Sequence, residues 1–279
     1  MNKNTRLIQL SLAFLAVILA VVLFYAPARK NLLKSSKPSK EAAKSTSVED
    51  FIISAKADLS PAQISNFANW ELALNSAIET DKIAYLDSLS TAWSVLKNPY
   101  LAAHYLKQKA NLDANKESYL RSGRLYFLAF ETLKDSSFKD QSLKEATALF
   151  EKVQEIDPKD DDVRLELALC YIENPTNPMR GISLLRQLID ENPKNENALF
   201  NLGILSMRSG QFDKAIGRFE EILAFSPERI ELFRYIAHCY EQIGEKDKAI
   251  VYFSRFKSKT SDQRLRDETD RYIEKLKEE

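Results

Sequence analysis

A period of 34 residues runs through the carboxyl-terminal half of the chain. Four pairs of residues share this spacing: Pro193 with Pro227, Gly210 with Gly244, Ala215 with Ala249, and Phe219 with Phe253. A period of this length indicates one small structural unit that is repeated and stacked, so that neighbouring units bury a continuous core. The chain has only 6 Gly and 9 Pro in 279 residues and is rich in Ala, Leu, Glu and Lys, which favours helices. Each unit is therefore predicted to be a pair of helices, and the fold class to be all-α.

Small residues recur at two places in each unit. They are Gly123, Ala168, Gly203 and Ala237 in the first helix, and Ala146, Gly181, Ala215 and Ala249 in the second. We expect the two helices to cross closely there, because larger side chains would hold them apart. Gly210 and Gly244 are predicted to lie in the turn between the helices, where φ is positive. The closing prolines are expected to stop the second helix.

With these positions in place, the unit Glu196–Arg229 resembles the tetratricopeptide repeat family. The matching residues are Leu199, Leu202, Gly203, Ala215, Phe219, Ile222 and Pro227. The resemblance covers residues 161–263 well. It is weaker over 116–160, where about 11 extra residues separate the two helices, and degenerate over 83–115. It implies a right-handed solenoid of stacked antiparallel helix pairs, with the aromatic residue of each second helix filling the space between neighbouring units.

The amino terminus carries an uncharged apolar stretch from Leu7 to Ala26, long enough to cross a bilayer as a helix. We predict an uncleaved transmembrane anchor. A cleaved signal peptide is the alternative, since Ala26-Pro27-Ala28 has the form of a cleavage site. The predicted organisation is an anchor over 1–28, a basic linker over 29–57, amino-terminal helices with a degenerate repeat over 58–115, four repeats over 116–263 and a capping helix over 264–279.

The orientation of this anchor has two opposing indications. Six Lys or Arg residues follow the span between Arg29 and Lys44, which favours a cytoplasmic carboxyl side. A short basic lead with Lys3 and Arg6 is instead typical of a signal-anchor that sends the rest of the chain across. Single-anchor bacterial repeat proteins resemble this arrangement. Our expectation is a single-pass protein of the bacterial inner membrane whose repeats lie in the periplasm.

No residue pattern indicates catalysis, a cofactor or a metal site. The chain has two histidines and two distant cysteines, Cys170 and Cys239, and lacks nucleophile, phosphate-binding and zinc motifs. The acidic run Asp157–Asp162 lacks the glycine and closing glutamate of a calcium loop, and is expected to favour a helix start instead. The formal net charge is zero, so a nucleic-acid partner is not expected.

The family resemblance implies a ligand groove lined by the first helices. Carried over by position, the groove residues are Leu120, Arg124, Phe127, Leu165, Leu169, Ile172, Phe200, Ile204, Met207, Arg208, Arg234 and His238. Its middle is apolar, so something is expected to cover it. The two occupants considered are an apolar helix or extended segment of a partner protein, and the chain's own amino-terminal helices or a second copy.

Two classes of function follow from these features. The first is a membrane-tethered scaffold for protein–protein interaction without catalysis, bound to a protein or peptide partner. An accessory role in assembling an envelope complex, for instance in c-type cytochrome maturation, is its variant. The second is a self-associating structural protein whose groove serves oligomerisation.

Overall fold

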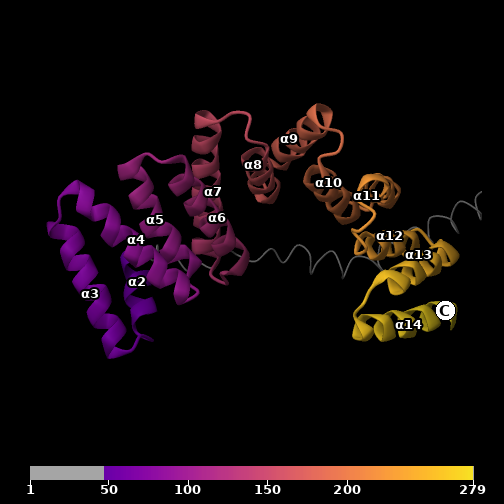
Figure 1. Cartoon of the computed structure of the whole chain (residues 1–279), viewed down its shortest axis with the longest axis horizontal. Coiled ribbons are helices and arrows are strands. Elements are labelled where there is room, and N and C mark those ends of the chain that lie inside the picture. Colours follow the sequence, from indigo (N-terminus) through magenta and orange to yellow (C-terminus); the bar gives the residue numbers. More distant parts are fainter. Residues whose placement is uncertain (1–46, 279) are drawn as a thin grey trace, which may run out of the picture. The chain divides into compact units, whose positions relative to one another are not determined.

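The computed structural model describes residues 47–278, and this part of the chain is all-α with thirteen helices (Figure 1). The chain divides into two units, Met1–Asp58 and Leu59–Glu279. The first contains α2 (Val48–Lys56). The second contains α3 (Pro61–Ser76), α4 (Glu79–Val95), α5 (Pro99–Asp113), α6 (Lys116–Thr132), α7 (Ser136–Ile156), α8 (Asp161–Glu173), α9 (Pro178–Glu191), α10 (Glu196–Arg208), α11 (Phe212–Phe225), α12 (Leu232–Gln242), α13 (Lys246–Lys259) and α14 (Gln263–Glu278).

The helix α2 lies within the segment predicted to be a linker, where no helix was predicted. Ser47 and Asp50 form a reciprocal capping box, in which each side chain accepts from the backbone N–H of the other residue. This satisfies two N–H groups that a helix start otherwise leaves free. The predicted span Leu7–Ala26 lies outside the described residues. Within 47–278, none of the helices combines the length and apolarity needed to cross a membrane.

The second unit is built from successive antiparallel helix pairs, as the period predicts. The pairs are α4 with α5, α6 with α7, α8 with α9, α10 with α11, and α12 with α13. The side chains of Asn115, Asp160 and Asn195 cap α6, α8 and α10 by accepting backbone N–H groups. The predicted role of the acidic run at Asp160 is thereby confirmed. Gly210 and Gly244 lie in the turns with φ of 71° and 82°, also as predicted.

The close crossings within the pairs α6–α7 and α10–α11 are confirmed by what surrounds their glycines. A Cβ on Gly203 would lie 2.4 Å from Cε1 of Phe219, and one on Gly123 would lie 2.7 Å from Cε1 of Phe150. The aromatic ring of the second helix therefore fills the space over the glycine of its own unit. This refines the prediction that the ring fills the space between units, although Phe219 also meets Tyr235 of the next unit at 5.4 Å.

The extra residues between α6 and α7 lengthen both helices and leave the loop short. The helix α6 has 17 residues, against 13 in α8 and α10. The helix α7 has 21, against 14 in α9, α11 and α13. The ends of α6 and α7 nearest their connection therefore extend beyond the regular repeat. This extension forms part of the site described next.

Candidate functional site

The first helices α6, α8 and α10 together line a cavity of about 430 Å³. Five of the predicted groove residues meet there: Phe127, Leu169, Ile172, Ile204 and Arg208. All four apolar members are half-buried, so each keeps surface that faces solvent. They recur on the same side of successive first helices because the units stack in register. We call this space the groove cavity.

Six further residues line the groove cavity. They are Phe130, Glu131, Lys139, Glu173, Asn201 and Leu205. Three of them, Phe130, Glu131 and Lys139, belong to the extended ends of α6 and α7. The ammonium of Lys139 lies 4.8 Å from the ring centroid of Phe130, which joins the two helices in one wall. The insertion was visible in the sequence, but a regular repeat gave no position for its residues.

Ion pairs connect the first helices across the groove. Arg208 Nη1 of α10 lies 2.9 Å from Glu173 Oε1 of α8. Arg124 of α6 donates through Nε to Glu166 Oε1 of α8 at 2.7 Å, beside a smaller hollow that also contains Phe127 and Leu169. Burial raises the pKa of the Glu166 carboxyl, and the bond from Arg124 acts in the opposite direction.

The other predicted groove residues of α6, α8 and α10 do not line the groove cavity. Leu120 is buried and presents no binding surface. The ring of Phe200 lies 6.0 Å from that of Phe219 and 5.6 Å from that of Tyr235, so its substitution would disturb the core. Met207 packs against the core around Phe219, and Leu165 against the core around Leu185; both are half-buried.

Arg234 and His238, in α12, lie in the last helix pair and are not among the residues that line the groove cavity. The guanidinium of Arg234 lies over the ring of Phe256 at 5.2 Å. His238 meets the ring of Tyr272 of α14 at 5.9 Å, and Tyr272 donates its hydroxyl to Glu241 at 2.8 Å. His238 was predicted to contact a ligand, and the last helix, α14, packs against this residue.

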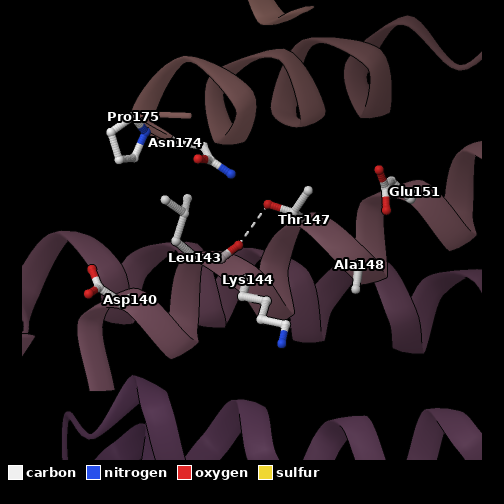
Figure 2. A pocket seen from close by; sticks show the side chains of 8 residues that line it. All are labelled: Asp140, Leu143, Lys144, Thr147, Ala148, Glu151, Asn174 and Pro175. Atoms are coloured by element: carbon white, nitrogen blue, oxygen red, sulfur yellow. Dashed lines mark hydrogen bonds between the residues drawn. The ribbon is translucent and has the colours of Figure 1, made fainter. Parts of the chain in front are cut away.

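A second cavity, of about 450 Å³, lies between α7 and the turn after α8 (Figure 2). Its Thr147 hydroxyl donates to the carbonyl of Leu143, and Glu151 accepts from Tyr171 at 2.5 Å. Figure 2 shows Asp140 and Glu151 at opposite ends of the cavity, so its acidic groups do not converge. We see no arrangement for acid–base chemistry among these side chains.

Metal and thiol chemistry find no support in the part of the chain that the structure describes. Within residues 47–278, no group of three or more His, Cys, Asp or Glu side chains is placed to hold a metal ion. Both cysteines are buried, and burial raises the pKa of Cys170 to about 12 and that of Cys239 to about 11. A thiol with such a pKa is a weak nucleophile at neutral pH.

Residues 178–231 match the family model of the tetratricopeptide repeat. Lipopolysaccharide assembly protein B of Haemophilus influenzae is 28% identical over 123 residues, which are 42% of this chain and 31% of that protein. Anaphase-promoting complex subunit 3 of Dictyostelium discoideum is 31% identical over 86 residues, which are 29% of this chain and 9% of that protein. The chain thus spans less than a third of each of these relatives.

Solved structures with a similar arrangement include a MamA protein, with 20% identity and a TM-score of 0.49 over 64% of this chain and 92% of that one. Another is YrrB, described as a TPR protein with an unusual peptide-binding site, with 18% identity and a TM-score of 0.46 over 71% of this chain and 98% of that one. Residues 178–231 are thus a tetratricopeptide repeat segment, and the described helices on either side of it pack as pairs in the same way.

Proposed function

We propose that the chain is a membrane-tethered scaffold that holds an apolar segment of a partner protein in the groove cavity, without catalysis of its own. Tetratricopeptide repeats mediate protein–protein interactions. The observation that carries the proposal is the half-buried apolar floor of Phe127, Leu169, Ile172 and Ile204, which comes from three different first helices. Covering such a gathered apolar surface with a partner is favourable, because it removes the surface from water. We also propose that the helix pairs stack into a right-handed solenoid.

The charges around the groove cavity favour an apolar occupant. Its four charged lining residues are two acids, Glu131 and Glu173, and two bases, Lys139 and Arg208. They balance one another, and Arg208 already pairs with Glu173. A charged segment would therefore gain little at this point, whereas apolar side chains would remove the floor from water.

The tether and the envelope location rest on the sequence. The apolar stretch Leu7–Ala26 has the length of a bilayer span, and the basic segment from Arg29 would follow it. The similarity to a protein named for lipopolysaccharide assembly supports an accessory role in building an envelope complex. It reaches only 31% of that protein, so lipopolysaccharide itself is not part of the proposal.

Leu169→Glu and Phe127→Glu are each expected to abolish partner binding by the full chain while leaving it folded. A carboxylate on the floor would have to be buried unpaired under the partner, which costs several kcal/mol. The matched control is Val251→Glu on α13, where the wild-type side chain is 48% exposed. Photo-crosslinking from position 169 in native membranes, with mass spectrometry of the captured peptide, measures binding.

The expected crosslink joins position 169 to an apolar segment of another protein, and the same reagent at position 251 does not capture it. Phe127→Glu should remove this crosslink. If position 169 captures a second copy of the chain, the self-associating alternative holds instead. If Phe127→Glu folds and the same peptide is still captured, the binding surface lies elsewhere.

An alkaline phosphatase fused after Ser60 is expected to be active, because the proposed orientation places the repeats in the periplasm. A cytoplasmic fluorescent reporter at the same position should be inactive under that orientation. The reverse pair of activities would place the repeats in the cytoplasm, in agreement with the basic residues that follow the span.

A further inference from the structure

A second concave site adjoins the groove cavity and carries mostly positive charge. It has a volume of about 440 Å³ and is lined by parts of α9, α10 and α11. Its charged lining residues are Arg186, Arg208, Lys214 and Arg218, with no Asp or Glu among the residues that line it. Because the whole chain has a formal net charge of zero, this is a local excess of cations. We call it the basic pocket.

Three of the four cations lack a carboxylate partner among residues 47–278. Arg218 donates to the Ser206 hydroxyl at 2.6 Å, and Lys214 donates to the amide oxygen of Gln211 at 2.7 Å. Arg186 makes no hydrogen bond or ion pair with any side chain that the structure describes. Arg186 and Arg218 line the same pocket. Burial and then the charge of Arg186 lower the pKa of the Arg218 guanidinium, and the charge of Glu221 acts in the opposite direction.

Arg186 and Arg218 face one pocket, and neither forms an ion pair with an acid among residues 47–278, so an anion bound between them would reduce their repulsion. Elsewhere in the second unit, arginines that approach the first helices meet acids, as Arg124 meets Glu166 and Arg229 meets Glu196. Planar guanidinium groups bind carboxylates through paired, charge-assisted hydrogen bonds. The unpaired cations therefore indicate that the basic pocket binds a carboxylate or another anion.

The basic pocket and the groove cavity adjoin each other. Both are lined by Ile172, Leu205 and Arg208, so a polypeptide in one reaches the other within a few residues. We propose that the partner segment held in the groove cavity carries acidic side chains, and that Arg186 and Arg218 bind a carboxylate of that segment in the basic pocket. This inference rests on the proposed function and adds a charge requirement to it.

The test selects a displayed library of random short peptides on the full-length protein. Three forms are compared: wild type, the double variant Arg186→Gln with Arg218→Gln, and the groove variant Leu169→Glu. Wild type is expected to enrich peptides with an apolar core and neighbouring Asp or Glu. The double variant should enrich apolar peptides without the acids. Individual acidic peptides should bind wild type about tenfold more tightly than the double variant, the effect of losing a charge-assisted hydrogen bond.

Folding of the double variant is checked by its melting temperature, expected to equal or exceed that of wild type because a like-charge contact is removed. Arg186→Gln alone, at an exposed side chain, is the second variant and should lose part of the acidic preference. If wild type and double variant enrich the same apolar peptides with equal acidity, the charge requirement is wrong and the groove proposal stands. If wild type enriches no more than Leu169→Glu, the groove proposal fails and the charge requirement falls with it.

Free inorganic phosphate distinguishes a small-anion site from the proposed one. If phosphate raises the melting temperature of wild type but not of the double variant, while selection shows no acidic preference, the pocket serves small anions and the inference is overturned. With the acidic preference present, phosphate is expected only to compete with the acidic peptides.

Discussion

Gly203→Leu is expected to lower the stability of the repeat domain by about 3 kcal/mol or more, at the upper end of the cost of overpacking a core. The Cβ alone would lie 2.4 Å from Phe219 Cε1 and 2.8 Å from Cζ. Phe219 cannot move away easily, since it is fully buried between Phe200 and Tyr235. The first helix of the unit would have to separate from the second.

Thermal denaturation of the full chain measures this loss, with roughly 2–4 °C expected for each kcal/mol in a domain of this size. Hydrogen exchange should show the largest loss of protection in α10 and α11, because each repeat contacts only its neighbours. A melting temperature within a degree or two of wild type would contradict the close crossing.

Gly217→Ala is the matched control for this change. Gly217 lies in α11 of the same repeat, and a Cβ there would meet nothing within 4 Å. Because glycine in a helix interior costs about 0.5–1 kcal/mol relative to alanine, the control is expected to raise the melting temperature. Opposite signs at two glycines of one repeat would separate the effect of the crossing from that of helix propensity.

Much of the fold is predictable from the sequence because repeat packing is local. The small residues at Gly203 and Ala215 and the prolines that follow α7, α9 and α11 depend only on contacts within one unit or between neighbours. The helix α2 was missed although Ser47 and Asp50 carry its capping signal, because lysines and serines dominate the surrounding composition. A short reciprocal cap can outweigh such a composition locally.

The site was less predictable than the fold, for two physical reasons. The position of a residue within a repeat indicates which way its side chain points, but not how deeply its neighbours cover it. Leu120 was expected on the groove surface and is buried. The wall formed by Phe130 and Lys139 comes from an insertion that has no place in the regular unit. The basic pocket combines Arg186, Arg208 and Arg218 from three helices, which a scan along one helix does not bring together.

Trp93→Ala is expected to destabilise the amino-terminal end of the repeat domain by about 3–5 kcal/mol, the usual cost of removing a buried aromatic side chain. Trp93 is 1% exposed and heads the fully buried side chains of the described chain by volume. Its ring lies 4.6 Å from that of Phe67, which is the one buried residue of α3. The indole therefore holds α3 onto the degenerate repeat formed by α4 and α5.

The indole N–H of Trp93 has no hydrogen-bond partner among residues 47–278, which makes Trp93→Phe an informative companion. An unsatisfied buried donor costs about 1–3 kcal/mol, so phenylalanine loses packing but also removes this penalty. We therefore expect Trp93→Phe to be much milder than Trp93→Ala.

Leu72→Ala, at a side chain of α3 that is 71% exposed, is the control and should change stability little. Hydrogen exchange in α3, α4 and α5 reports the local effect beside the thermal melt. Equal losses for Trp93→Phe and Trp93→Ala would mean that the indole N–H is satisfied in solution, and an unchanged melt for Trp93→Ala would mean that α3 is not held by this contact.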